Sequence, residues 1–246
     1  MKVSKTNTRQ KIRMMINIAS FLAFPLTIYY LSPVVCIFGA KAGVINGSLL
    51  MFAILFLSAL LLGRAYCGWV CPAGTLKDNY QFINNKRIKH NWIKYIFWIP
   101  WLAAMIILFI RSGGISRIEI LHHMDHPLSI LNKGGVIVYF SIILLITALS
   151  LLVGRHAFCH KLCWMAGFMV VGAWIGKQLR IPVLHIKVDK EKCNDCGICT
   201  NVCPMSIDVQ EAFKNGPIAS AECINCGSCA DNCNRKALSY TFRRMK

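Results

Sequence analysis

The chain has 246 residues, 13 cysteines and a formal net charge of +18 at pH 7; 56% of its residues are hydrophobic and only 15% are charged. This composition excludes an ordinary soluble domain and indicates a membrane protein. No nucleic-acid-binding motif accompanies the basic surplus, so membrane lipid is the expected partner and nucleic acid is not.

Four apolar runs predict transmembrane helices, because each is close to the ~20 residues that cross a bilayer. They occupy residues 14–31, 47–63, 93–110 and 135–153. Pro25 and Pro100 lie inside two of these runs, where neighbouring helices can satisfy the freed backbone groups. No small-residue cleavage site follows the first run, so we expect it to be a retained helix rather than a signal peptide.

The basic residues predict the orientation of these spans. Of the 28 Lys and Arg residues, 24 lie on the side of the N-terminal tail, and the opposite loops hold only Lys41, Arg111, Arg117 and Lys133. The positive-inside rule places the basic side in the cytoplasm. We therefore expect a multi-pass protein of the cytoplasmic (inner) membrane with both termini in the cytoplasm, where thiols stay reduced.

The second and fourth predicted spans end in related sequences. One reads GRAYCGWVCPAG from Gly63, and the other reads GRHAFCHKLCWMAG from Gly154. Spans one–two and three–four are therefore predicted to be two parallel-repeat hairpins, related by an axis along the membrane normal. If each C-x-x-x-C stays helical, its cysteines share a helix face, so four thiols are predicted to converge: Cys67, Cys71, Cys159 and Cys163.

Converging thiolates indicate a soft metal or an iron–sulfur cluster. A third [4Fe–4S] cluster is the leading interpretation of the double motif, and another thiolate-bound metal is the second interpretation. Buried packing cysteines and a redox-active dithiol pair remain alternatives. His156 and His160 flank Cys159 and are interpreted as partners of the ligands, alternative ligands or interfacial surface histidines.

The predicted outer loop, residues 111–133, is rich in histidine and acidic residues. Imidazole titrates near neutrality, so these side chains are candidates to accept protons from a quinol. A copper or other metal site and a plain solvated loop are the alternatives. The candidate catalytic residues are His122, His123, Asp125 and His126, beside Glu119.

Eight further cysteines form two blocks with the spacing C-x-x-C-x-x-C-x-x-x-C, the bacterial ferredoxin arrangement for two [4Fe–4S] clusters. In that arrangement the fourth cysteine of each block serves the cluster of the other block. The predicted ligand sets are Cys193, Cys196, Cys199 and Cys233 for one cluster, and Cys223, Cys226, Cys229 and Cys203 for the second. Structural zinc and a disulfide framework fit this spacing and the expected compartment less well.

These features predict two domains. Residues 1–180 are expected to form a four-helix transmembrane domain that ends in an apolar interfacial segment, residues 167–180. Residues 181–246 are expected to form a small α+β ferredoxin domain that begins with a strand at 183–188 and returns near 217–221. The predicted fold class is thus an α-helical membrane protein with a C-terminal bacterial-type 2[4Fe–4S] ferredoxin domain.

The chain resembles the membrane iron–sulfur family that includes NapH, NosR and CcoG. The resemblance rests on SPVVCIFGAKAGVINGS from Ser32, on the double C-x-x-x-C, and on the paired ferredoxin blocks. Without a flavin domain or a C-terminal extension it is most similar to the compact NapH type. Two departures are Trp164, where the family has proline after the second motif, and Asn234, where ferredoxins usually have proline.

The resemblance implies electron exchange between membrane quinol and other redox proteins. The expected function is an iron–sulfur relay between the quinone pool or a partner reductase and other redox proteins, which includes the role of a quinol dehydrogenase subunit. A copper-handling reductase of the CcoG kind and a structural anchor of a larger redox complex are alternatives. The expected cofactors are two [4Fe–4S] clusters, with a third thiolate-bound centre and a quinone in the leading interpretation.

Overall fold

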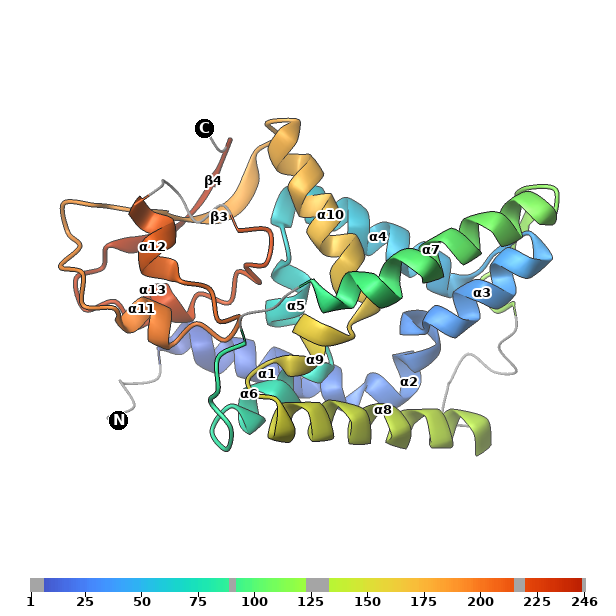
Figure 1. Ribbon diagram of the computed structural model, residues 1–246, viewed down its shortest axis with the longest axis horizontal. Helices are drawn as coiled ribbons and strands as arrows, with labels where there is room; N and C mark the ends of the chain where they lie inside the picture. The colour runs from blue at the N-terminus through green and yellow to red at the C-terminus, as the bar shows by residue number, and fades with distance from the viewer. Residues whose placement is uncertain (1–6, 89–91, 123–132, 215–219, 245–246) are drawn as a thin grey trace.

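The computed structural model of the chain describes residues 7–88, 92–122, 133–214 and 220–244. Helices dominate up to residue 180, and a two-stranded sheet with short helices follows (Figure 1). The elements are α1 (Thr8–Leu22), α2 (Phe24–Thr27), η1 (Ile28–Leu31), α3 (Pro33–Ala42), β1 (Val44–Ile45), α4 (Gly47–Leu62), α5 (Ala65–Trp69), α6 (Ala73–Tyr80), α7 (Ile93–Arg111), β2 (Arg117–Ile118), α8 (Lys133–Leu152), α9 (Ala157–Lys161), α10 (Trp164–Gln178), β3 (Val183–Val188), α11 (Ile198–Asn201), α12 (Val209–Lys214), α13 (Ser228–Asp231) and β4 (Leu238–Arg243).

Two helices in the described ranges, α7 and α8, are long and apolar enough to cross a membrane. A third such unit consists of α1 followed by α2 and η1. The chain bends by 56° between α1 and the segment formed by α2 and η1. Pro25 lies just after this bend, and in a continuous helix its ring would clash with the carbonyl four residues earlier. The remaining expected span corresponds to α4, an apolar helix of 16 residues.

The outward faces of α7 and α8 are apolar. Large exposed apolar surfaces are typical of membrane proteins, and the side chains on these faces are each more than half exposed: Ile96, Phe97, Ile99, Ile106, Ile107, Ile110, Ile137, Phe140, Leu144 and Leu152.

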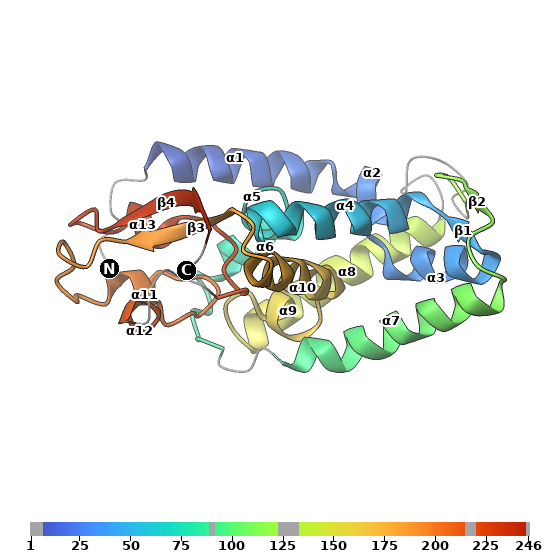
Figure 2. The ribbon, with the colours of Figure 1, turned by 90° about the horizontal axis from the view of Figure 1, so that it is seen from above.

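The cysteine-rich C-terminal part lies at one end of the molecule, and the small parallel sheet β1–β2 lies at the other (Figure 2). The helices between them run back and forth along the long axis, so α4 and α8 both end near the C-terminal part. At the far end, the Asn46 side chain accepts a hydrogen bond from the Leu49 N–H and so begins α4.

Helix α10 covers part of the segment that the sequence predicts to be interfacial, and it packs along α4. A Cβ at Gly172 would lie 2.8 Å from the carbonyl oxygen of Phe56, and one at Gly176 would overlap that of Leu60. Glycines four residues apart thus let the two backbones approach closely, as small residues do between membrane helices.

The C-terminal part is built on an antiparallel pair of strands. β3 matches the predicted strand, and it pairs with β4 so that Val183 lies opposite Arg243 and Val188 opposite Leu238. The returning strand expected at 217–221 is not the partner of β3. Residues 220–221 are not in a strand, and residues 217–219 lie outside the described ranges.

Candidate iron–sulfur centres

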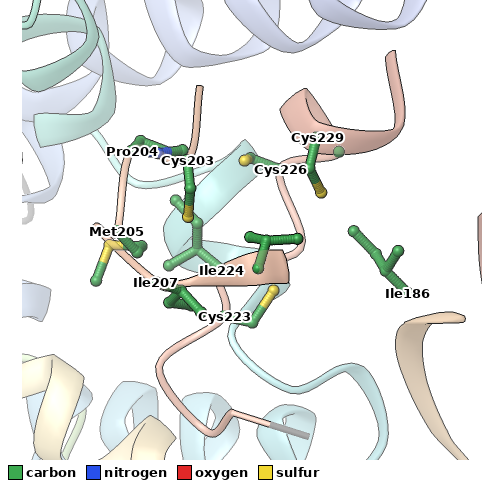
Figure 3. Close-up of a pocket in the computed structure, with 11 residues that line it drawn as sticks. Ile186, Cys203, Pro204, Met205, Ile207, Cys223, Ile224, Cys226 and Cys229 are labelled. Atoms are coloured by element: carbon green, nitrogen blue, oxygen red, sulfur yellow. The ribbon is translucent and has the colours of Figure 1, made fainter. Parts of the chain in front are cut away.

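One cavity in the C-terminal part, called here the inner cavity, is lined by cysteines from both ferredoxin blocks. Its walls include Cys223, Cys226 and Cys229 of the second block and Cys203 of the first. The four side chains surround this space in Figure 3. The rest of the lining is apolar and includes Ile186, Met205, Ile207, Val209 and Ile224.

A second cavity of similar size, the outer cavity, has the complementary set of cysteines. It is lined by Cys193, Cys196, Cys199 and Cys233. Polar side chains contribute more here, among them Asn194, Asp195, Gln210 and Arg235. Cys196 is exposed, whereas Cys203, Cys226 and Cys229 of the inner cavity are buried.

The backbone repeats its conformation in the two blocks. Left-handed φ values of 52° at Asp195 and 71° at Gly197 are matched by 49° at Asn225 and 76° at Gly227. Short helices α11 and α13 begin directly after the two glycines and carry the third cysteine of each block. This repeated turn brings three cysteines of a block around one space, and the chain beyond the helix carries the fourth to the other cavity.

The electrostatics of the thiols agree with this grouping. Burial, together with the neighbouring thiol of Cys226, raises the pKa of Cys203 to about 11. Burial and the thiols of Cys226, Cys223 and Cys203 likewise raise the pKa of Cys229. Cys203 therefore interacts with the second block rather than with its own.

The four cysteines of the double C-x-x-x-C, called here the motif cysteines, are all buried near the ends of α4 and α8. They are Cys67, Cys71, Cys159 and Cys163, and their exposed fractions are 7%, 3%, 2% and 4%. Burial and the thiols of Cys159, Cys67 and Cys71 raise the pKa of Cys163. The structure therefore brings all four predicted residues together.

The motifs do not stay helical, contrary to the expectation from their spacing. α5 ends at Trp69, before Cys71, and α9 ends at Lys161, before Cys163. Backbone N–H groups of Cys71 and Cys163 donate to the carbonyls of Tyr66 and Phe158, 2.9 Å in both cases. The two motifs thus fold in the same way, as one short helical turn closed by the second cysteine.

A buried lysine lies among these thiols. Lys77 of α6 is 1% exposed, and its Nζ lies 2.9 Å from Sγ of Cys159 and 3.9 Å from Sγ of Cys71. Burial opposes ionisation of Cys159, but the neighbouring Lys77 and His156 outweigh it and lower the pKa of this thiol. Sequence patterns do not single out Lys77, because only the fold brings α6 against α9.

Several buried polar atoms beside the motif cysteines have no hydrogen-bond partner among the described residues. Both ring nitrogens of the fully buried His160 are unpaired, as are Nε and one terminal nitrogen of Arg64 and Nδ1 of His156. Nε2 of His156 lies 3.1 Å from the Asp78 carboxylate. Because buried polar atoms without partners are uncommon in proteins, a concentration of them in one place favours a bound ion or group there.

The described residues contain no group of three or more Cys, His, Asp or Glu arranged to hold one metal ion. A cluster is larger than an ion, and a cavity lined by four cysteines is the donor set that a [4Fe–4S] cluster requires. The inner and outer cavities therefore fit such clusters, and the four buried motif thiols fit a thiolate-bound centre.

The motif cysteines and the inner cavity are in direct contact through the backbone. Gly68 lies between the two cysteines of the first motif, and Ile224 lies between Cys223 and Cys226. A Cβ at Gly68 would overlap the carbonyl oxygen of Ile224. Trp69 Nε1 also donates to the carbonyl of Asn225 at 2.9 Å. Only glycine permits this approach.

The structure describes only the beginning of the candidate catalytic loop. Of its four residues only His122 is described, and His123, Asp125 and His126 lie outside the described ranges. His122 Nδ1 is 3.2 Å from the carboxylate of Glu119, just after β2. β2, which His122 follows, lies at the end of the molecule opposite the C-terminal part (Figure 2).

An apolar cavity of about 390 Å³ lies between α4, α7 and α10. Its lining is aromatic and aliphatic: Leu49, Phe52, Ala53, Phe56, Trp98, Trp101, Leu102, Met105, Phe168 and Val171. Phe168 is five residues along the chain from Cys163, or roughly 8 Å along the helix axis. Nε1 of Trp98 is buried and has no hydrogen-bond partner in the part of the chain that the structure describes.

Matches to known families agree with the two kinds of cysteine group. Residues 46–90 and 136–182 match the family model described as a 4Fe–4S binding domain, so each half of the internal repeat matches it. Residues 192–238 match the 4Fe–4S dicluster domain. Fold and site together define a membrane ferredoxin with 4Fe–4S binding domains.

Its relatives identify the family within that class. The chain is 27% identical over 194 residues to the ferredoxin-type protein NapH of Haemophilus influenzae, a match that covers 75% of this chain and 64% of NapH. It is 26% identical over 254 residues to YccM of Escherichia coli, covering 92% of this chain and 66% of YccM. The methylamine utilization ferredoxin-type protein MauN of Methylorubrum extorquens is 30% identical over 175 residues, with 68% of this chain and 57% of MauN covered.

The chain belongs to the NapH-like family of membrane ferredoxins. It spans slightly less than two thirds of the length of NapH and YccM. No solved structure matches it significantly.

Proposed function

We propose that this protein is a membrane-anchored iron–sulfur electron-transfer protein, which relays electrons between a donor in the membrane and redox proteins at the cysteine-rich end. The proposal is supported by three successive groups of four cysteines: the motif cysteines, the inner cavity and the outer cavity. The observation that carries it is the contact of Gly68 with Ile224, because it places the first two groups side by side.

In this proposal each cavity holds one [4Fe–4S] cluster with crossed ligation, and bound clusters supply the one-electron chemistry. Cys223, Cys226, Cys229 and Cys203 would hold the inner cluster, and Cys193, Cys196, Cys199 and Cys233 the outer one. Asn234 replaces the usual proline after Cys233 without removing a ligand. The protein contributes ligation, burial and a fixed order of sites.

The motif cysteines would hold a third centre, a [4Fe–4S] cluster or another thiolate-bound metal. Four buried thiols with a lysine between them, and unpaired polar atoms on His160, Arg64 and His156, support an additional group at this position. The match of both motif regions to a 4Fe–4S binding domain supports iron and sulfide as its components.

The different burial of the two cavities supports an order of the clusters along the molecule, with the outer cluster nearest to soluble partners. The inner cavity is apolar and adjoins α5, whereas the outer cavity includes the exposed Cys196. A soluble redox protein can approach the outer cavity closely, so the outer cluster is the proposed point of exchange. Whether electrons leave or enter there depends on the potentials of the partners.

For the membrane arrangement we propose four spans in the inner membrane, with both termini in the cytoplasm. Residues 1–180 would form the transmembrane domain, and residues 181–246 the ferredoxin domain. The apolar outward faces of α7 and α8 and the 24-to-4 distribution of basic residues support this topology. The alternating course of α1, α4, α7 and α8 also supports it.

A quinol is the proposed membrane donor, and two places on the molecule are candidates for its site. The first is the outer loop with His122, His123, Asp125 and His126, whose side chains could accept protons. The second is the apolar cavity beside α10, which is open to a planar, lipid-soluble ring and lies near Cys163.

The experiment uses the full chain in proteoliposomes loaded with a quinol, and follows cluster reduction by its absorbance. Reduction by quinol and reoxidation by a soluble acceptor are expected. Replacing His122, His123 and His126 together by Ala tests the loop, and Ala53→Phe, which fills the apolar cavity, tests the second place. If quinol reduces none of the clusters in the iron-loaded wild type, the proposed donor is wrong.

A further inference from the structure

The lysine among the motif cysteines has an unusual environment. Within the described ranges no carboxylate lies within ion-pairing distance of Lys77, and its hydrogen-bond partners are the sulfurs of Cys159 and Cys71. The neighbouring carboxylates are already engaged: Asp78 by Arg13 and His156, and Glu222 by Arg64 and Lys94. A buried ammonium without a counter-charge is strongly unfavourable.

Thiolates at the motif cysteines would supply that counter-charge. Arg64, Lys77 and Lys94 are each at most 1% exposed, and all three interact electrostatically with Cys159. Glu222 carries one negative charge for two of these cations, so the surroundings of the thiols keep a positive surplus. A tetrathiolate [4Fe–4S] centre carries about two negative charges when oxidised and about one more when reduced, so this surplus favours the reduced form.

We propose that Lys77 sets the reduction potential of the third centre, by donating an N–H···S hydrogen bond to Cys159 and by placing a buried positive charge beside the thiolates. This inference rests on the proposed third centre. Both effects stabilise the form that carries one additional electron, since hydrogen bonds to the sulfurs and local charge are what tune such centres. Lys77 thereby makes the motif centre a better electron acceptor than the same thiolates alone.

The test is a redox titration of the purified full chain, monitored by electron paramagnetic resonance, beside iron and sulfide analysis. In Lys77→Met the reduction equilibrium of the motif centre is expected to shift at least tenfold toward the oxidised form, which is ~59 mV for one electron. Lys77→Arg keeps the charge and should stay near the wild type. Lys77→Gln keeps only the hydrogen-bond donor and should lie between them.

Lys187→Met is the matched control, because Lys187 is exposed on β3, where solvent and salt screen its charge. It removes the same charge and should leave the potential of the motif centre unchanged. If Lys77→Met retains the iron and sulfide of the wild type with an unchanged potential, the inference about Lys77 is overturned while the third centre stands. If the wild type itself has only the iron of two clusters, the proposed third centre fails instead.

A measurement on the wild type covers the case in which every Lys77 variant loses the centre. With ¹⁵N-labelled lysine, pulsed magnetic resonance of the reduced motif centre should detect a coupling to the lysine nitrogen. Absence of that coupling in a chain that contains the third centre would overturn the hydrogen bond to Cys159.

Discussion

Glu222 and Arg64 form an ion pair between the C-terminal part and the end of α4, with 2.5 Å between the carboxylate and a guanidinium nitrogen. Arg64 is fully buried, and the ammonium of the buried Lys94 contacts the other oxygen of Glu222. Glu222 directly precedes Cys223. The same carboxylate thus pairs with two buried cations and fixes the inner cavity against the helices.

Replacing Glu222 by Ala should therefore strongly lower the free energy of unfolding. It leaves two buried cations without a partner, and breaking a buried ion pair in this way costs roughly 3–5 kcal/mol. Chemical unfolding in detergent should show this loss, together with faster proteolysis between α10 and β3. Asp189→Asn, which removes an exposed pair with Lys192, is the control and should cause no measurable change. Equal stability of the two variants would contradict the role of Glu222.

The Gly68→Ala substitution tests the contact between the motif cysteines and the inner cavity. A Cβ at Gly68 overlaps the Ile224 carbonyl, so the C-terminal part must shift, at an overpacking cost of about 1–3 kcal/mol. Iron content should be retained, while electron transfer from the motif centre to the inner cluster slows. Rapid-mixing kinetics of cluster reduction measure this step.

Gly74→Ala is the matched control for Gly68→Ala. Its Cβ would meet the side chain of Asn17 at 3.1 Å and does not face the C-terminal part. It should keep the wild-type rate of reduction of the inner cluster. The same rate in both variants would show that the contact with Ile224 does not carry the electron path.

Cys203→Ala tests the crossed ligation. Cys203 belongs to the first block in sequence but lines the inner cavity, so the variant should lose or alter the inner cluster and keep the outer one. Cys233→Ala should do the reverse. Magnetic resonance spectra of the two variants distinguish the clusters, and damage to the outer cluster alone in Cys203→Ala would refute the assignment.

The spacing of the two ferredoxin blocks is sufficient to predict these ligand groups, because the repeat determines which cysteines share a turn. The convergence of Cys67, Cys71, Cys159 and Cys163 is also predictable, although the motifs close as single turns rather than as continuous helices. Periodicity indicates which residues share a face of a helix but does not show where a helix ends. Gly63 and Gly154, both with positive φ, follow the ends of the preceding helices and mark those ends only once the backbone conformation is known.

The contacts that order the sites could not be predicted from sequence patterns. Gly68 and Ile224 are far apart in the chain, and their contact depends on how the C-terminal part packs on α5. By sequence Lys77 is one of the basic residues that determine topology, whereas the fold buries it between two thiols. The packing of α10 along α4 likewise depends on tertiary contacts that an apolar composition does not specify.

The membrane topology makes a separate prediction. Single cysteines at the chain ends, replacing Lys2 or Lys246 in a background without other accessible thiols, should react with a membrane-impermeant reagent only after the cells are opened. Ile118→Cys, at an exposed position of β2, should react in intact cells. Labelling of either terminus from outside intact cells would contradict the predicted orientation.

The central claim is that the motif cysteines hold a centre in addition to the two ferredoxin clusters, so that three centres lie in succession. The most direct measurement is the iron and acid-labile sulfide content of the anaerobically purified full chain, compared with a variant in which Cys67, Cys71, Cys159 and Cys163 are all Ser. We predict about 12 iron atoms in the wild type and about 8 in the variant, because each [4Fe–4S] cluster contributes four. About 8 iron atoms in both proteins, with no other metal in the wild type, would contradict the claim.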